Sequence, residues 1–348
     1  MLTFGLIADI QHAPIPDGFS FGGVPRYYKH ALDTAKVAAK DFSQQSCDFA
    51  VNIGDTIDGK CGDDTIANGA LSDVVDNLGN FQNGEWYGII GNHELYNFGR
   101  KRWGSSMFAS ATTSERGINC QVSTENNADD IEDNLVGYYS FDKEDFRFIV
   151  VDCYDITSLK RSPTSEKGKL ASDYLSKNPN EEKNSPVGLQ NLDQRFVAFN
   201  GAVGANQLIW LRNMLQKSVD EEKKVIILSH VPFYPPIAPP TTLCWNYDEV
   251  LNLFGEFKNV IKATLCGHTH TSCYEQVRDG EERSEECSRS EATSQQSLIC
   301  SSFSFSRLIA NMTCRTPTRT STTSSSRRRW RVSHQFTRIR LLNSGTTT

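Results

Sequence analysis

The chain lacks long apolar segments. No apolar run among its 348 residues approaches the roughly 20 residues that a membrane-spanning helix needs. Residues 2–8 begin a strand-like pattern, without the basic segment and longer apolar stretch of a secretory signal. We therefore expect a cytoplasmic protein with no membrane partner.

Closely spaced cysteine pairs are also missing. The ten cysteines are scattered, and Cys47, Cys153 and Cys266 lie in or beside apolar runs. This distribution is typical of reduced thiols and not of a disulfide framework, which small secreted domains use. We therefore expect free thiols. We also expect the protein to be a monomer.

Lysine is absent from residues 271–348, where 28 of 78 positions are serine or threonine. Twelve arginines and seven acidic residues give this tail a net charge of +5. Because the whole chain has a net charge of −6, the first 270 residues carry a net charge of −11. That acidity argues against a nucleic-acid partner, although bound metal can still attract phosphate. The change in composition predicts a catalytic domain at 1–270 and an atypical Ser/Thr/Arg-rich tail at 271–348.

Strand-like and helical segments alternate along the first 270 residues. Phe4–Ala8 is typical of a strand, and Tyr27–Phe42 has the apolar spacing of a helix. This alternation predicts an α/β fold whose site lies at the carboxyl ends of strands. Polar inserts at about 99–137 and 157–205 are expected to be loops over the site, with a disordered surface insert as the alternative for the first.

Five short polar clusters occur at or just past predicted strand ends. They are Asp9-Ile10-Gln11, Gly54-Asp55-Thr56-Ile57-Asp58, Gly91-Asn92-His93-Glu94, Ser229-His230-Val231-Pro232 and Gly267-His268-Thr269-His270. Alone, Asp-x-Gln carries little weight, and Gly-Asp-x-x-Asp is a moderate signal because Asp and Gly also build turns. A single histidine would more often belong to the core. Together they supply enough carboxylate, amide and imidazole groups for two metal ions, which is a centre suited to hydrolysing phosphate esters and anhydrides.

The types of ligand restrict the choice of metal. Asp55 has two carboxylate oxygens that can bridge two cations. Oxygen and nitrogen ligands without thiolate suit manganese, iron or zinc, and suit magnesium less well. The neutral oxygen of Gln11 favours Mn²⁺ among these. His93, between Asn92 and Glu94, is a candidate to protonate a leaving oxygen or to bind the phosphate.

These clusters, in this order, resemble the signature of the calcineurin-like metallophosphoesterase superfamily over about residues 3–270. Most members begin with Asp-x-His, whereas Asp9-Ile10-Gln11 is similar to one branch, the manganese-dependent ADP-ribose/CDP-alcohol diphosphatases. Other segments point to the same branch: Pro16-Asp17-Gly18, Val24–His30, Asn178-Pro179-Asn180, Asn184-Ser185-Pro186, Phe199-Asn200-Gly201 and Trp245-Asn246-Tyr247.

The resemblance implies a four-layer α-β-β-α sandwich of two mixed sheets, with the C-terminal strands in doubt. It implies two divalent metal ions, with His93 as the catalytic histidine. The first metal would be held by Asp9, Gln11, Asp55 and His270, and the second by Asp55, Asn92, His230 and His268. The implied substrates are ADP-ribose, split to AMP and ribose 5-phosphate, and CDP-alcohols such as CDP-choline and CDP-glycerol, split to CMP and a phosphorylated alcohol.

The same branch suggests substrate contacts in Phe19–Tyr28 and Leu243–Tyr247. Phe21 or Tyr28 would stack on a base, because an aromatic face accepts any nucleobase. Arg26 would bind the phosphate of the pyrophosphate that lies farther from the metals, through paired hydrogen bonds. Cys244 and Asn246 complete the predicted substrate-binding residues. Packing of the aromatics against the domain is the alternative interpretation.

Other functions remain open from the sequence. The chain could be a phosphomonoesterase, a cyclic-nucleotide phosphodiesterase or a phosphoprotein phosphatase, although Gln11 and Arg26-Tyr27-Tyr28 argue against these. It could be a metal-binding scaffold impaired in catalysis, because the resemblance stops after His270. We interpret the tail as a shifted reading frame or mis-joined exon in preference to a lineage-specific end. An RNA-binding arm around Arg327-Arg328-Arg329 is the remaining alternative.

Overall fold

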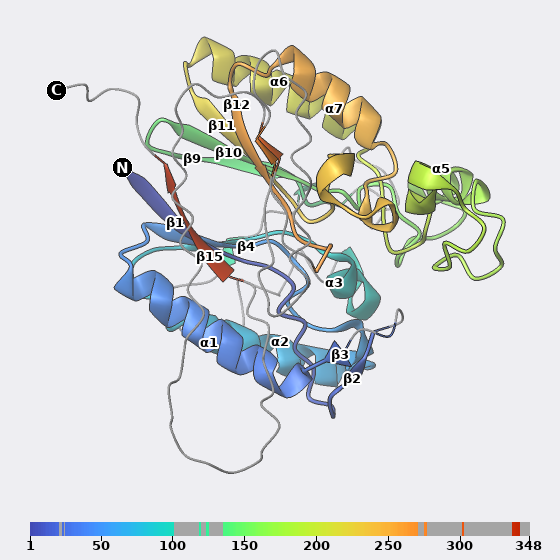
Figure 1. Ribbon diagram of the computed structural model, residues 1–348, viewed down its shortest axis with the longest axis horizontal. Coiled ribbons are helices and arrows are strands. Elements are labelled where there is room, and N and C mark those ends of the chain that lie inside the picture. Colours follow the sequence, from blue (N-terminus) through green and yellow to red (C-terminus); the bar gives the residue numbers. More distant parts are fainter. Residues whose placement is uncertain are drawn as a thin grey trace.

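The computed structural model describes residues 1–20, 23, 25–100, 118–119, 123–124, 135–270, 275–276, 301–302 and 336–341. Two β-sheets face each other, and helices cover the outer side of each sheet (Figure 1). Helices α1 (Tyr28–Gln44) and α2 (Asp64–Leu78) cover the first sheet, and α6 (Ala205–Asp220) and α7 (Tyr247–Glu256) cover the second. The expected four-layer α-β-β-α sandwich is confirmed.

The first sheet has five strands in the order β15-β1-β4-β5-β6. Their bounds are Phe336–Leu341, Leu2–Ile7, Phe49–Asn52, Trp86–Gly88 and Ile118–Asn119. Strands β1, β4, β5 and β6 are parallel, whereas β15 runs antiparallel to β1. The sheet is therefore mixed, and its parallel strands end at the same edge.

The second sheet has four strands in the order β12-β11-β10-β9. Their bounds are Ile261–Leu265, Lys224–Ser229, Phe146–Val151 and Tyr139–Lys143. Strands β10, β11 and β12 are parallel, and β9 runs antiparallel to β10. The carboxyl ends of β11 and β12 therefore also lie together.

Alternating side chains of the strands form the core between the sheets. Leu2, Phe4 and Leu6 of β1 belong to this buried cluster, because successive strand residues point to opposite faces. Phe4 stacks on Phe49 with ring centroids 5.0 Å apart and meets the edge of Phe148 at 5.4 Å. Each such aromatic contact contributes about 0.5–1.5 kcal/mol beyond the area that it buries.

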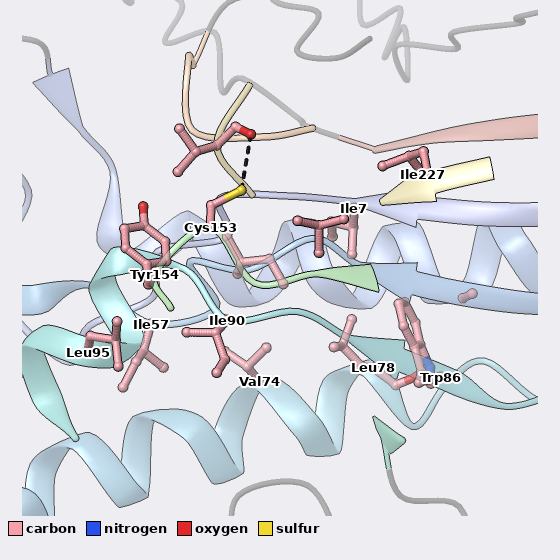
Figure 2. Close-up of a cluster of buried hydrophobic side chains, with 14 of the residues drawn as sticks. Ile7, Ile57, Val74, Leu78, Trp86, Ile90, Leu95, Cys153, Tyr154 and Ile227 are labelled. Carbon is pink, nitrogen blue, oxygen red and sulfur yellow. Dashed lines mark hydrogen bonds between the residues drawn. The ribbon is translucent and has the colours of Figure 1, made fainter. Parts of the chain in front are cut away.

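A second apolar layer lies between the helices and the outer faces of the sheets. Figure 2 shows Val74 and Leu78 of α2 beside Trp86 and Ile90 of the β5 segment. α2 begins at a good N-cap, since the side chain of Asp63 accepts hydrogen bonds from the backbone N–H groups of the first turn. The packing of this layer holds the strands in place, and with them the loops that follow their carboxyl ends.

Shorter elements complete the described fold. They are β2 (Gly18–Phe19), β3 (Pro25–Arg26), η1 (Gly59–Cys61), α3 (Asn92–Asn97), β7 (Ser123–Thr124), β8 (Leu135–Val136), α5 (Glu166–Ser176), η2 (Asn191–Arg195), η3 (Pro235–Ile237), η4 (Pro240–Thr242), β13 (Glu275–Gln276) and β14 (Ser301–Ser302). The predicted insert at 157–205 contains α5 and η2. Most of the insert at 99–137 lies outside the described residues.

Strand β15 brings part of the atypical tail into the first sheet. It pairs along the whole of β1, from Leu2 opposite Leu341 to Ile7 opposite Phe336. Ile339 and Leu341 are buried in the core between the sheets. The sequence left the C-terminal strands in doubt, and β15 is one such strand that pairs with β1. The domain boundary at residue 270 stays a prediction.

Among the described residues, none of the helices combines the length and apolarity that crossing a bilayer requires. The cysteines within the described part of the chain are buried and outside any disulfide: Cys47, Cys61, Cys153, Cys244 and Cys266.

Candidate metal centre

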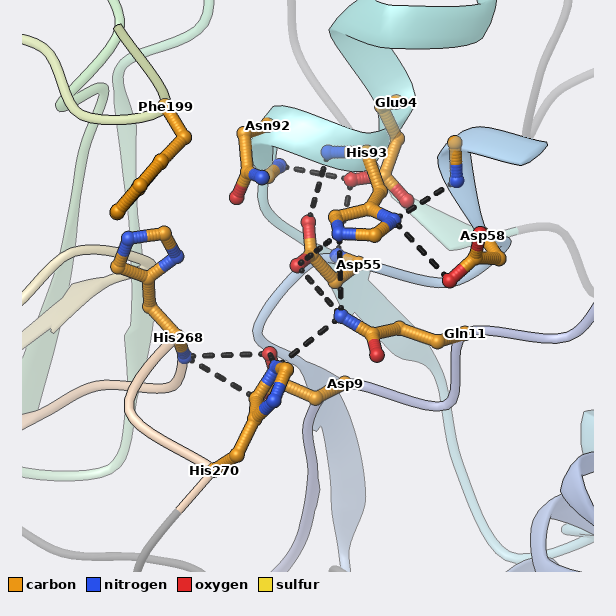
Figure 3. A network of polar contacts seen from close by, with 12 residues as sticks. Asp9, Gln11, Asp55, Asp58, Asn92, His93, Glu94, Phe199, His268 and His270 are labelled. Atoms are coloured by element: carbon orange, nitrogen blue, oxygen red, sulfur yellow. Dashed lines mark hydrogen bonds and ion pairs between the residues drawn. The ribbon is translucent and has the colours of Figure 1, made fainter. Parts of the chain in front are cut away.

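All five polar clusters meet at the carboxyl ends of the two sheets. Asp9 and Gln11 follow β1, Asp55 follows β4, and Asn92 opens α3 after β5. His230 follows β11, and His268 and His270 follow β12. Figure 3 shows most of these side chains pointing toward one another from separate loops. Parallel strands explain the convergence, because their carboxyl ends share one edge of each sheet.

The side chains form two groups that share one carboxylate. Asp55, His230 and His268 offer ligand atoms within 4.8 Å of one another, and so do Asp9, Asp55 and His270. Asp55 is only 1% exposed. A buried aspartate common to both groups has the position required to bridge two cations.

Several of these residues have an unusual backbone conformation. The φ angles of Asp9, Gln11, Asp55, His268 and His270 lie between 48° and 69°, in the left-handed region. Such a conformation costs on the order of 1–3 kcal/mol at a strained non-glycine position and persists only where the surroundings enforce it. Strain of this kind is concentrated at functional sites, which agrees with the clustering seen here.

Glu94 holds the Asp55 loop in place. Its carboxylate accepts hydrogen bonds from the backbone N–H groups of Gly91 at 2.8 Å, Asp55 at 2.9 Å and Thr56 at 2.6 Å. Burial, followed by the nearby charge of Asp55, raises the pKa of Glu94. The sequence placed Glu94 beside His93, but its contacts with this loop were not predicted.

His230 presents one ring nitrogen to the site. Its Nδ1 lies 2.7 Å from the carbonyl oxygen of Ile53, which can only accept, so Nδ1 is the donor. Its Nε2 is 3.4 Å from Oδ2 of Asp55 and has no hydrogen-bond partner among the described residues. Burial would lower the pKa of His230, but Asp55 and then Asp9 raise it to about 9.

The buried atoms at the centre fit divalent cations. Both Nε2 of His230 and Oε1 of Gln11 are buried without a hydrogen-bond partner in the part of the chain that the structure describes. An unsatisfied buried polar atom is costly, and a cation bound to Nε2 of His230 would satisfy that atom. The amide of Gln11 turns its Nε2 toward Asp55 and His270, so a flip of this amide would bring Oε1 to a cation there. The donor set of carboxylate, amide and imidazole is also the one that suits Mn²⁺, Fe or Zn²⁺.

The charges of the two aspartates are favoured by the histidines around them. Burial tends to raise the pKa of Asp55, but His230 and His93 bring it well below its ordinary value. His270, whose Nε2 is 3.1 Å from Oδ1 of Asp9, likewise lowers the pKa of Asp9 against the effect of burial. Burial, helped by the charge of His230, lowers the pKa of His268 to about 3. The centre therefore offers anionic oxygens and a neutral His268 at neutral pH.

His93 lies at the mouth of this centre and is 15% exposed. The backbone N–H of Gly59 donates to its Nδ1 at 2.8 Å. Nδ1 is therefore the acceptor in this bond, which leaves Nε2 for contacts within the centre. That nitrogen is 3.3 Å from Nε2 of Gln11 and 3.7 Å from Oδ2 of Asp55, and it therefore faces the centre.

Two of the predicted substrate-binding residues lie beside the centre. Nη1 of Arg26 is 2.9 Å from Nδ1 of His270, and Arg26 lines a small pocket with Asp9 and Gln11. Tyr28 lines the same pocket but is only 2% exposed, which is the packing arrangement that the sequence left as the alternative to stacking. Phe21 lies outside the described residues.

Cys244 and Asn246 are held by contacts within the fold. The Cys244 thiol donates to the carbonyl oxygen of Gly201, and Oδ1 of Asn246 accepts from the N–H of Val203. Nδ2 of Asn246 donates to the carbonyl oxygen of Val203 and to Glu249. Both residues are buried and neither lines the pocket at Arg26, so their role in binding substrate stays a prediction.

The structure adds two residues that the sequence did not assign to the site. Tyr154, three residues beyond the predicted strand that ends at Val151, donates to Oδ1 of Asn92 at 3.1 Å. Asn200 lies 2.8 Å from His268. The signal for Asn200 was the Phe199-Asn200-Gly201 segment, whereas Tyr154 looks like part of an apolar run.

Comparisons with known proteins agree with this geometry. The family model described as calcineurin-like phosphoesterase matches residues 2–272. A protein of Oryza sativa subsp. japonica named manganese-dependent ADP-ribose/CDP-alcohol diphosphatase is 38% identical over 276 residues, which cover 78% of each chain. A protein of Arabidopsis thaliana with the same name is 36% identical over 279 residues, covering 79% of this chain and 81% of the relative.

The fold also matches a solved structure. A crystal structure described as a dimetal phosphatase from Danio rerio is 32% identical, with a TM-score of 0.67, and the match covers 77% of this chain and 82% of that one. The ligand clusters, the sandwich and these similarities show that the chain belongs to the calcineurin-like phosphoesterase family and, within it, to the manganese-dependent ADP-ribose/CDP-alcohol diphosphatases.

Proposed function

We propose that this protein is a manganese-dependent hydrolase of nucleoside-diphosphate-linked compounds. ADP-ribose would yield AMP and ribose 5-phosphate, and CDP-choline or CDP-glycerol would yield CMP and a phosphorylated alcohol. The observation that carries the proposal is the sharing of buried Asp55 by two ligand groups, in a chain whose relatives bear this enzyme name. Its location in the cytoplasm and its monomeric state stay predictions.

Each metal would be held by side chains from both sheets. Asp9, Gln11, Asp55 and His270 would hold the first, and Asp55, Asn92, His230 and His268 would hold the second. When bound, the pair of cations supplies positive charge that polarises the phosphate and stabilises the charge that develops on its oxygens. The unpartnered Nε2 of His230 supports this assignment.

His93 would act on the substrate and not on the metals. Its Nε2 faces the centre, because the N–H of Gly59 occupies Nδ1. From this position it would donate to an oxygen of the scissile phosphate or to the leaving oxygen. Arg26, beside His270, would bind the more distant phosphate of the pyrophosphate.

The test is a comparison of substrates with Mn²⁺. ADP-ribose, CDP-choline and p-nitrophenyl phosphate are incubated with the protein, and the products are separated by chromatography. We expect the first two to be split at the pyrophosphate and the monoester to react poorly. Preference for p-nitrophenyl phosphate would favour a phosphomonoesterase instead, and inactivity toward all three with metal bound would favour a non-catalytic scaffold.

Two variants connect the activity to the centre. Asp55→Asn should abolish Mn²⁺-dependent turnover, because it removes the shared carboxylate. Asp33→Asn removes an exposed carboxylate of α1 and serves as the matched control with unchanged turnover. His93→Asn should lower turnover by about 10²–10⁴-fold, the usual size of a general acid–base contribution. Full activity of either Asp55→Asn or His93→Asn would refute the assignment.

A further inference from the structure

Asn200 is a buried side chain in the loop between η2 and α6, and it contacts a candidate metal ligand. It is 0% exposed. Its Oδ1 lies 2.8 Å from Nε2 of His268. Its Nδ2 lies 2.9 Å from the carbonyl oxygen of Arg195 and 2.8 Å from that of Thr241. One side chain therefore joins η2, η4 and the loop after β12.

These contacts fix the orientation of the Asn200 amide. Carbonyl oxygens can only accept hydrogen bonds, so the end of the amide that faces Arg195 and Thr241 must be the NH₂ group. Its two protons are then both used. The opposite end, which faces His268, is consequently the oxygen, and it can only accept.

We propose that Asn200 is a positioning residue that selects the tautomer of His268, and the proposal rests on the proposed metal centre. Since Oδ1 of Asn200 accepts, Nε2 of His268 must carry the proton. A neutral imidazole has one N–H, so Nδ1 keeps the lone pair that a metal needs. Partners beyond the ligands commonly fix the tautomer and ring orientation of metal-binding histidines in this way.

The backbone contacts of His268 do not select the tautomer of its ring, so a side-chain partner is needed for that. Its backbone φ of 69° is in the left-handed region, and its backbone N–H donates to Asp9. Those contacts place the residue but leave both ring nitrogens undetermined. The contact with Asn200 distinguishes the two nitrogens, and the amide is itself anchored on two carbonyls.

The wild-type protein alone provides the first test. Ring ¹⁵N shifts of histidine distinguish the two tautomers, and His268→Gln identifies the signals by their loss. We expect metal-free protein to show His268 protonated at Nε2. Predominance of the Nδ1–H form would overturn the proposal, whatever the activity of the protein.

The second test compares two buried asparagines. Asn200→Ala should mix the tautomers of His268 and weaken Mn²⁺ binding about 10- to 100-fold, measured from the free Mn²⁺ signal by electron paramagnetic resonance. Asn178→Ala is the matched control, because Asn178 is equally buried and its Nδ2 also donates to loop carbonyls, those of Lys183, Ser185 and Phe196. It should leave tautomer and affinity unchanged.

The two variants separate positioning from simple loop stability. An unchanged tautomer with wild-type affinity in Asn200→Ala would refute the proposal. Equal losses of affinity in both variants, with the tautomer unchanged, would assign Asn200 a structural role only and would also refute it. Neither readout uses substrate. Failure of the proposed hydrolase activity would therefore leave this test intact, and failure of this test would leave the activity intact.

Discussion

Metal binding should displace a proton from His230. The ring is buried, and the carboxylates of Asp55 and Asp9 raise its pKa to about 9 even though burial acts in the opposite direction. At pH 7 the metal-free ring therefore carries a proton on both nitrogens. Nδ1 keeps its proton because it donates to Ile53, so Nε2, which faces Asp55, must release its proton to a metal.

The size of the effect follows from this pKa. At pH 7, about two units below it, proton competition weakens metal binding about 100-fold, equivalent to about 2.7 kcal/mol. Apparent affinity should rise about tenfold per pH unit from pH 7 and level off near pH 9, because above that value the ring is already neutral. The lowered pKa values of Asp9, Asp55 and His268 mean that these ligands carry no proton to release at pH 7.

The assay is calorimetric titration with Mn²⁺ at pH 7 in two buffers of different ionisation enthalpy. The difference in heat counts the protons released. Wild-type protein should release about one proton more than His230→Gln, which retains an oxygen donor but has no ionisable ring. Equal proton release by the two proteins, or a wild-type affinity independent of pH between 7 and 8.5, would refute the reasoning.

Three further predictions concern the support of the centre and the fold. Tyr154→Phe removes the donor to Asn92 and should weaken Mn²⁺ binding about 10-fold without unfolding the protein, which titration and thermal melting can check. Asp152→Asn leaves the buried guanidinium of Arg100 without its 2.6 Å ion pair and should lower the free energy of unfolding by about 3–5 kcal/mol at pH 7. Burial raises the pKa of Asp152, but Arg100 lowers it overall. The stabilisation is therefore present above the ordinary pKa of a carboxyl group and is lost as the pH falls through the pKa of the folded state. Urea unfolding should show the free energies of unfolding of the wild type and Asp152→Asn converging in acid. Deletion of residues 336–348 should expose the edge of β1 and cause concentration-dependent aggregation. A particle size unchanged from that of the full chain in light scattering would contradict the pairing.

The identity of the candidate ligands could be predicted from the sequence because the signal is local. A strand pattern followed by a polar pair, as at Asp9 and Gln11, indicates a side chain at the carboxyl end of a strand. The alternation of strands and helices predicted an α/β fold with its site at strand ends, and the resemblance carried by five such clusters in one order implied the four-layer sandwich. The comparisons bear out the fold and the family, whereas the role of each ligand remains to be tested.

The sequence did not predict contacts that depend on distant backbone atoms. Asn200 meets His268 across 68 positions, and the two carbonyl oxygens that orient its amide lie 5 and 41 positions away. The pattern of side chains carries no information on where those carbonyls point. The burial of Tyr28 and the pairing of β15 with β1 are decided in the same way, by packing that assembles only in the folded chain.

By itself, the sequence determined which chemical groups are available and that strand ends would present them. The tertiary structure alone decided which nitrogens of His93, His230 and His270 face the centre, that Asp55 is common to two ligand groups, and that a strand from the tail pairs with β1. The physical reason is the separation in sequence between the groups that interact. Strand alternation is set by neighbouring residues, whereas a hydrogen-bond partner or a shared ligand is set by atoms up to hundreds of positions apart, such as Asp9 and His270.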